Sequence, residues 1–253
     1  MRYGSMYALL RFYLRYRVSA QAPVLFFPGT LCDERIFMPL WRQLSIAQRR
    51  FVPLQWATSK DDMLALSEDR ILADEKVHIV GYSMGGYIAS LIAARNKANI
   101  ASITLIAYDP AGLSANEISQ RENMVKSLKK GQFKPDNHNY LARFIHPSRL
   151  ADTNVTEVVT SMAKDLGKST LLAHTLATTP RENTLKLLEK INAPVTLVGA
   201  IDDNIAHIDS LRYAAKLLPN ASLHEFENTG HMLPLEQTSQ LATIIGKCIG
   251  VQK

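Results

Sequence analysis

A serine between glycines lies where an apolar run gives way to a helix-like stretch. The segment GYSMGG (residues 81–86) follows KVHIV and precedes YIASLIAAR. A serine hydroxyl is a poor nucleophile at neutral pH unless it protrudes and a neighbouring base takes its proton. A tight strand-to-helix turn makes a serine protrude, and glycines at 81 and 85 relieve the crowding of such a turn. The pattern therefore predicts that Ser83 is a nucleophile; the alternative is a turn serine that caps a helix.

The GYSMGG turn and later segments resemble the α/β-hydrolase superfamily over roughly residues 20 to 250. That superfamily orders its triad as serine, then acid, then histidine along the chain. Its acid follows the strand after the inserted segment, here VTLVGA, and its G-x-x-D spacing fits Gly199 to Asp202. The resemblance thus implies Asp202 as the acid, with the adjacent Asp203 as the first alternative and Asp109 as the second. For Asp202 and Asp203 the non-catalytic alternative is a turn or N-cap role.

A glycine-histidine pair follows the last predicted strand, SLHEFE. The string GHMLPLEQ resembles the terminal motif of the superfamily and implies His231 as the base of the triad. Of the seven histidines, His231 alone has this order and context. For His78, His174 and His207 we expect ordinary packing or surface roles.

The resemblance also implies an oxyanion hole, in which two backbone N–H groups point at one position. One donor would be Met84, directly after the nucleophile. The other would come from the loop PGTLCD after VLFF, with Thr30 as the expected donor and Leu31 as the alternative. Relatives usually carry His-Gly where this chain has Pro-Gly, a departure that removes a side chain and leaves the donor. We expect Cys32 to be a buried thiol, with a reactive cysteine as the alternative.

Short apolar runs that alternate with helix-like stretches must position these residues. The runs are continuous, as in strands buried on both faces, and the alternation predicts a mostly parallel, doubly wound α/β sheet. The resemblance implies that this sheet has the α/β-hydrolase fold with an inserted helical cap. The predicted strands are VLFF, FVPLQW, KVHIV, ITLIAY, VTLVGA and SLHEFE. Between Asp109 and about Pro180 the chain instead has the helix-like segments NEISQRENMVKSLKK, NYLARFI, VTEVVTSMAKDL and KSTLLAHTLA.

These patterns divide the chain into a core of residues 21–110 and 181–253 and a helical cap at 111–180. Helices inserted after a strand's end lie over the carboxyl edge of the sheet, where ligands bind; a peripheral decoration is the alternative. Residues 1–20 would form an N-terminal extension or an edge strand, because residues 11–18 alternate with a period of two. Contact with a membrane surface through residues 1–18 is the alternative interpretation of that basic segment.

Composition narrows the function classes. Four of the six net positive charges lie in the first 23 residues, and no nucleic-acid-binding motif accompanies them, so we expect no nucleic-acid partner. Two distant cysteines form no disulfide framework and no apolar run reaches transmembrane length, so we expect reduced thiols and a cytoplasmic location. Neither a metal-ligand cluster nor a dinucleotide fingerprint occurs, so we expect no cofactor and no metal.

The resemblance implies a serine hydrolase, most simply a carboxylesterase. Its substrate would be a carboxylic ester or thioester with a small to medium acyl group, cleaved through an acyl-enzyme. A serine at the nucleophile position argues against dehalogenases and epoxide hydrolases, which use aspartate there. A C–C bond hydrolase, a lyase of the menaquinone-pathway type, and a receptor-like ligand-binding member with little turnover are the alternatives. Basic residues of the cap would form a solvated helix face, or favour anionic or carrier-linked substrates: Lys126, Lys129, Lys130, Lys134, Arg143 and Arg149.

Overall fold

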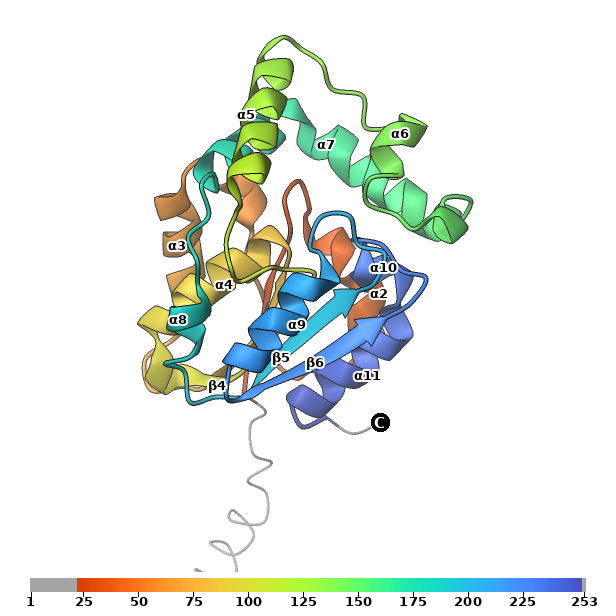
Figure 1. Ribbon diagram of the computed structural model, residues 1–253. Helices are drawn as coiled ribbons and strands as arrows, with labels where there is room; N and C mark the ends of the chain where they lie inside the picture. Colours follow the sequence, from red (N-terminus) through yellow and green to blue (C-terminus); the bar gives the residue numbers. More distant parts are fainter. Residues whose placement is uncertain (1–21, 252–253) are drawn as a thin grey trace, which may run out of the picture.

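One parallel sheet organises the protein (Figure 1). The computed structural model describes residues 22–251, so the expectations for residues 1–20 lie outside the described residues. The strand order is β2-β1-β3-β4-β5-β6, and every neighbouring pair is parallel. This confirms the predicted fold class. The strands are β1 (Val24–Phe27), β2 (Arg49–Phe51), β3 (Val77–Tyr82), β4 (Ile100–Ile106), β5 (Val195–Ala200) and β6 (Ala221–Phe226).

Side chains of the central strands enter two apolar layers, one on each face of the sheet. In β1, Leu25 and Phe27 belong to one layer, and Val24 and Phe26 belong to the other. Because helices cover both faces, neither face of a central strand can be polar, which explains the continuous apolar runs. The first layer is covered by α3 (Lys60–Glu68), α4 (Met84–Arg95), α8 (Leu185–Leu188) and α9 (Ile208–Leu217), and the second by α2 (Met38–Trp41), α10 (Leu233–Glu236) and α11 (Thr238–Cys248) (Figure 1).

Two elements of the core differ from the sequence prediction: the predicted strand FVPLQW overlaps β2 only at Phe51, and the helix-like stretch before it consists of short turns. Strand β2 ends at Phe51, and Leu54–Trp56 forms the 3-10 turn η2, because Pro53 has no N–H to donate to a strand ladder. The segment ERIFMPLWRQL is not one helix but the 3-10 turn η1 (Glu34–Ile36) followed by the single turn α2. Pro39 at the start of α2 cannot donate a helical hydrogen bond back to the preceding turn.

The segment between β4 and β5 contains only helices and loops, as predicted. It includes α5 (Ala115–Lys129), α6 (His138–Leu141), η4 (Pro147–Arg149) and α7 (Thr153–Ala177); the remaining short turn, η3 (Lys97–Asn99), precedes β4. We call α5, α6 and α7 the inserted helices; in Figure 1 they lie beyond the carboxyl ends of the strands. The two predicted segments at 155–166 and 168–177 are the halves of α7, which is interrupted at Gly167, where φ is 74°. Nowhere in residues 22–251 does a helix have the length and apolarity needed to cross a bilayer.

The buried centre of β4 should contribute strongly to the free energy of unfolding. Leu105 is fully buried in the first apolar layer, so Leu105→Ala removes apolar contacts and leaves a cavity, and we expect the free energy of unfolding to fall by about 2–5 kcal/mol. Equilibrium urea unfolding measures this change. His224→Ala, an exposed position on β6, is the control and should change it by less than about 0.5 kcal/mol. Equal losses in the two variants would contradict the assigned core.

Candidate active site

Ser83 lies in the tight turn between β3 and α4. Its backbone has φ 51° and ψ −117°, a conformation that is strained for a residue with a side chain. The turn is closely packed: a side chain at Gly85 would collide with the carbonyl of Phe27, and one at Gly81 would come within 2.8 Å of the Gly86 Cα. Both predicted glycines are therefore required by a close approach of backbone segments. The Ser83 side chain points out of this turn toward a histidine.

That histidine is His231, in the loop after β6. Its Nε2 lies 2.9 Å from the Ser83 Oγ, and its Nδ1 lies 2.8 Å from the Asp203 Oδ2. A carboxylate at Nδ1 places the ring proton there, which leaves the Nε2 lone pair to accept the serine O–H. The Asp203 side chain is fully buried, and its Oδ1 accepts hydrogen bonds from the N–H groups of Ile205 (2.7 Å) and Ala206 (3.0 Å). The three side chains form one continuous hydrogen-bonded row.

The carboxylate in this row is Asp203, and the expectation that Asp202 takes this place is wrong. Asp202 is 45% exposed, and its carboxylate lies 3.7 Å from the Nε2 of His146. After β5 the chain turns, and the Asp203 N–H donates to the carbonyl of Ala200, which directs residue 203 inward and residue 202 outward. Asp109, the other alternative, accepts a hydrogen bond from the Ala111 N–H at 2.8 Å and makes none to His231.

Backbone hydrogen bonds fix the position of the His231 residue itself. Its N–H donates to the carbonyl of Phe144, between α6 and α7, at 2.7 Å. Its carbonyl accepts the hydroxyl proton of Tyr82, the last residue of β3, at 3.0 Å. The histidine is thus held from one side by the inserted segment and from the other by the strand that carries Ser83. Neither contact could be predicted from the sequence, because each joins residues more than 80 positions apart.

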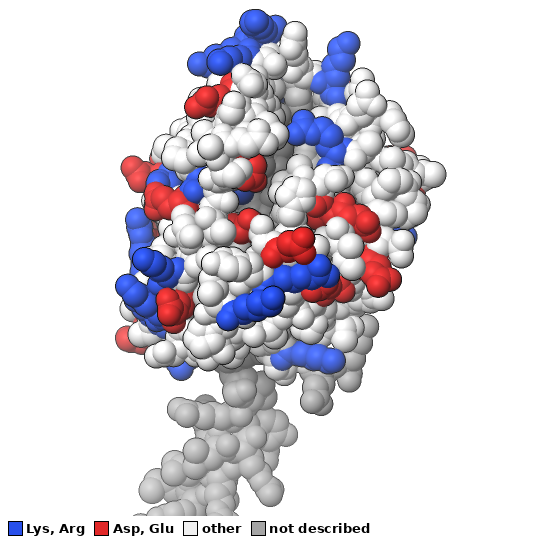
Figure 2. Space-filling view, viewed as in Figure 1, with Lys and Arg blue, Asp and Glu red and all other residues white. Residues whose placement is uncertain are grey.

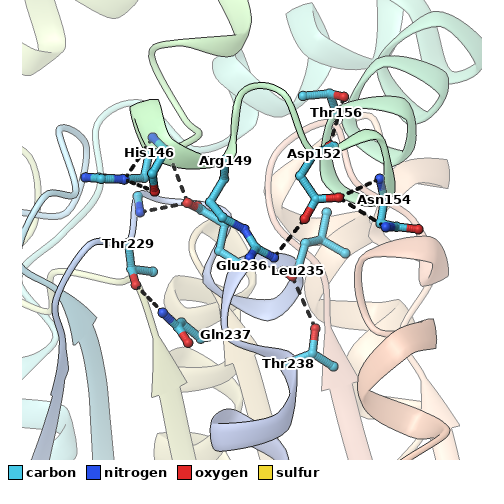
Figure 3. Close-up of polar contacts among 12 residues, drawn as sticks. His146, Arg149, Asp152, Asn154, Thr156, Thr229, Leu235, Glu236, Gln237 and Thr238 are labelled. Atoms are coloured by element: carbon cyan, nitrogen blue, oxygen red, sulfur yellow. Dashed lines mark hydrogen bonds and ion pairs between the residues drawn. The ribbon is translucent and has the colours of Figure 1, made fainter.

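Glu236 is a further positioning residue, which the sequence analysis did not single out. Its Oε2 accepts hydrogen bonds from the N–H groups of Gly230 (3.0 Å) and His146 (2.9 Å). Figure 3 shows Glu236 between the His146 segment and the loop that carries Thr229, and Gln237 donates to the Thr229 hydroxyl at 2.8 Å. Burial raises the pKa of Glu236. Its spacing of five residues from His231 is the signal in the sequence that could have indicated a role.

The loop that carries Thr30 is held by a buried histidine on α7. The Leu31 N–H donates to the Nδ1 of His174 at 3.1 Å, and the His174 Nε2 lies 3.0 Å from the carbonyl of Leu54. Leu31, the alternative oxyanion donor, has therefore already used its N–H. Among the described residues, neither the Thr30 N–H nor the Met84 N–H at the start of α4 has an acceptor. The loop is also tied to α7 by Arg35, which pairs with Asp33 and Asp165.

His174 must be neutral to make these contacts, because its Nδ1 accepts a hydrogen bond from the Leu31 N–H. The side chain is fully buried, and burial lowers its pKa to about 4. The expectation of an ordinary packing role for His174 is thus incomplete: the residue packs, but it also joins the loop of residues 28–33 to the inserted helices.

A cavity of about 680 Å³ opens at Ser83 beneath the inserted helices. Its wall includes Thr30, Leu31, Ser83 and His231 from the core, and Figure 2 shows the molecular surface hollowed between α5 and the α6 segment. The inserted helices and their connections contribute apolar side chains, which are Met124, Leu128, Phe133, Tyr140, Phe144, Val159, Met162, Ala163 and Leu171. This volume lies within the range of small-molecule sites.

Cys32 lies in the wall of the same cavity as a free, buried thiol. Burial raises its pKa to about 12, and the neighbouring Asp33 adds to the effect. Since the thiolate is the reactive form, a reactive Cys32 is not supported, which agrees with the expected buried thiol. In the described part of the chain, no three His, Cys, Asp or Glu side chains gather as a metal site would require.

The sheet and the serine turn define an alpha/beta hydrolase fold protein, and the chain belongs to that family, whose model matches residues 57–238. It is 27% identical over 188 residues to a pimeloyl-acyl-carrier-protein methyl ester esterase of Neisseria meningitidis serogroup B, with 72% of each chain covered. It is 26% identical over 204 residues to a 2-hydroxy-6-oxononadienedioate/2-hydroxy-6-oxononatrienedioate hydrolase of Pseudomonas putida, covering 76% of this chain and 70% of that one. A thermophilic esterase of Thermogutta terrifontis shares the fold with a TM-score of 0.75 at 18% identity, over 89% and 88% of the two chains.

Titration of His174 should be visible in the pH dependence of stability. Because the folded protein lowers its pKa from 6.5 to about 4, the unfolded chain binds this proton first as the pH falls. Stability is therefore lost between about pH 6.5 and 4, at up to about 1.4 kcal/mol per pH unit. Urea unfolding of the wild type and His174→Gln across this range measures the slope, which should be shallower in the variant. Parallel curves would show that His174 already titrates normally.

Proposed function

We propose that the protein is a serine hydrolase that cleaves a carboxylic ester, or a thioester, through an acyl-enzyme on Ser83. The observation that carries this proposal is the hydrogen-bonded row of Asp203, His231 and Ser83, with separations of 2.8 and 2.9 Å. These distances are those that a general base and its orienting acid need to activate a hydroxyl. The esterase relatives support hydrolysis of an ester as the class of reaction.

The mechanism follows from the positions of these side chains. As the Ser83 Oγ bonds to the acyl carbon, the Nε2 of His231 takes the hydroxyl proton, and Asp203 stabilises the resulting imidazolium. His231 then gives that proton to the leaving oxygen or sulfur, and the bond between acyl carbon and leaving group breaks. Water, deprotonated by His231, attacks the acyl-enzyme and releases the acid with Ser83 restored.

Two backbone donors would stabilise the oxyanion that forms in each step. We assign them to Met84 and Thr30. In support, the Met84 N–H begins α4, whose N-terminal end carries a positive partial charge, and Thr30 lines the cavity beside Ser83 and His231. Loss of one such donor typically lowers turnover by about 10²–10³.

The inserted helices would act as a cap over the acyl-binding cavity, with boundaries near residues 111 and 180. In support, apolar residues from α5 and α7 line the cavity together with Ser83. Leu31, Leu128, Ala163 and Leu171 form an apolar cluster of their own, against which an acyl chain of small to medium length can pack. Its hydrocarbon would gain about 25 cal/mol per Å² of surface removed from water.

A C–C bond hydrolase on the same triad is the second candidate. The observation that favours it is the match to the Pseudomonas putida hydrolase, a protein whose name gives an oxo-dienedioate or oxo-trienedioate as its substrate. That reaction also needs a carbonyl near Ser83 and an oxyanion site, so the triad alone does not distinguish it from ester hydrolysis. A panel that contains both p-nitrophenyl esters and a ring-fission-type diketone separates the two.

Ser83→Ala should abolish hydrolysis of p-nitrophenyl butyrate, because it removes the attacking oxygen. We expect turnover to fall by about 10⁵–10⁶-fold, while the unfolding transition in urea stays cooperative. A fluorophosphonate probe should label wild-type Ser83, located by mass spectrometry, and should fail to label the variant. Burst release of p-nitrophenol without turnover by the wild type would instead indicate a receptor-like binder, and labelling at another residue would contradict the assigned nucleophile.

The two adjacent aspartates provide a matched test of the acid. Asp203→Asn keeps the size of the side chain but removes the carboxylate that sets the His231 tautomer, so kcat should fall by about 10³–10⁴-fold. Asp202→Asn changes the neighbouring exposed carboxylate and should alter kcat by less than about threefold, since a surface ion pair contributes little. Steady-state kinetics on one ester compares them, and a larger loss in Asp202→Asn would refute the assignment.

A further inference from the structure

A small side pocket of about 30 Å³ adjoins the main cavity at Ser83. Ser83, Glu117, Arg121 and Ile205 line both spaces, so the side pocket is an extension of the main cavity. Arg181 and Asp109 complete the polar part of its wall. The volume holds about two water molecules, which is also the room that the two oxygens of a carboxylate occupy.

Two arginines in this wall lack the partners that buried guanidinium groups ordinarily have. The Nε and Nη2 of Arg181 are shielded from solvent and have no hydrogen-bond partner. Within residues 22–251, neither Arg121 nor Arg181 forms an ion pair with any carboxylate. The other contact of the Arg181 guanidinium is the face of the Tyr87 ring, at 5.9 Å. Since solvent does not reach these two nitrogens, the groups that can donate to an acceptor in the pocket are the Nη1 of Arg181 and the guanidinium of Arg121.

Two carboxylates share the pocket but are engaged elsewhere. The Oε2 of Glu117 accepts hydrogen bonds from the N–H (2.8 Å) and the hydroxyl (2.7 Å) of Ser114 at the start of α5. The Oδ1 of Asp109 accepts the Ala111 N–H. These two carboxylates balance the charge of the two arginines without accepting hydrogen bonds from the guanidinium groups. Recognition in the pocket therefore depends on directed guanidinium hydrogen bonds, and a planar carboxylate matches these better than a single-point acceptor does.

Two effects act on the pKa of Arg181. Burial, and next the neighbouring Arg121, lower its pKa to about 9. The group thus remains positively charged at pH 7. An anion between the two guanidinium groups would relieve both effects.

We propose that Arg121 and Arg181 bind a carboxylate of the substrate, so that the preferred substrates are half-esters of short dicarboxylic acids. This inference rests on the proposed ester hydrolysis at Ser83. The carboxylate lies in the side pocket while the ester carbonyl lies at the Ser83 Oγ. Since Ser83 itself lines the side pocket, only a short spacer fits between the two carbonyl carbons.

Monomethyl glutarate and methyl valerate form a matched pair of probes, because they have acyl chains of equal length and differ in the terminal carboxylate. With the wild type, titration of released acid should give a kcat/KM for the half-ester at least about tenfold above that for the neutral ester. In Arg121→Gln and Arg181→Gln this ratio should fall by about tenfold or more, since each change removes a charged donor. Arg143→Gln is the control: Arg143 lines the main cavity but not the side pocket, and the ratio should stay within about twofold of the wild type.

The outcomes separate this proposal from the proposed function. Hydrolysis of methyl valerate with no preference for the half-ester would overturn the carboxylate site and leave ester hydrolysis standing. An equal fall of the ratio in the Arg143 variant would overturn the assignment to the side pocket. Absence of hydrolysis, together with absence of fluorophosphonate labelling at Ser83, would overturn both. If Arg121→Gln or Arg181→Gln fails to show a cooperative urea transition, the ratio in the wild type decides the question.

Discussion

The close approach of α4 to the sheet is the constraint on which the rest of the site depends. Glycines at 81 and 85 let the helix begin against the carbonyl of Phe27. This close approach is accompanied by a strained backbone at Ser83. Such strain costs on the order of 1–3 kcal/mol and persists only where the surroundings determine it fully. Here the Ser83 N–H donates to Ile106 at 2.9 Å, and its carbonyl accepts from Gly86 at 2.9 Å. Both hydrogen bonds come from elements of the rigid core, so the hydroxyl has a fixed direction.

The inserted helices hold the site as well as cover it. The carbonyl of Phe144 accepts the N–H of His231, and His174 accepts the N–H of Leu31. One contact therefore fixes the loop that carries His231 and the other fixes the loop of residues 28–33, and both come from the same inserted segment. Movement of these helices would displace groups on two sides of Ser83 together. This coupling gives a physical reason why a change far from Ser83, within α7, can alter the chemistry at the serine.

The sequence predicted those features that depend on local pattern. Continuous apolar runs indicated the strands other than most of β2, and the glycine spacing indicated the tight turn that carries Ser83. The acid could not be placed in the same way, because Asp202 and Asp203 are adjacent and a one-residue difference in the turn after β5 decides which carboxylate points inward. Spacing from Gly199 favoured Asp202, whereas the hydrogen bond from the Asp203 N–H to Ala200 sets the actual direction. His174 was missed because its partners, Leu31 and Leu54, are 143 and 120 residues away.

Two buried carboxylates near His231 are held by different kinds of hydrogen bond, one local in sequence and one between distant segments. Asp203 accepts N–H groups from residues two and three positions ahead of it, which orients a side chain within its own loop. Glu236 accepts N–H groups from Gly230 and His146, which lie on separate segments, and so sets the distance between those segments. Burying a carboxylate costs free energy, and the hydrogen bonds that it accepts offset part of that cost. Loss of the Asp203 carboxylate would therefore remove the hydrogen-bond partner of the His231 Nδ1, whereas loss of Glu236 would change where the His231 ring lies.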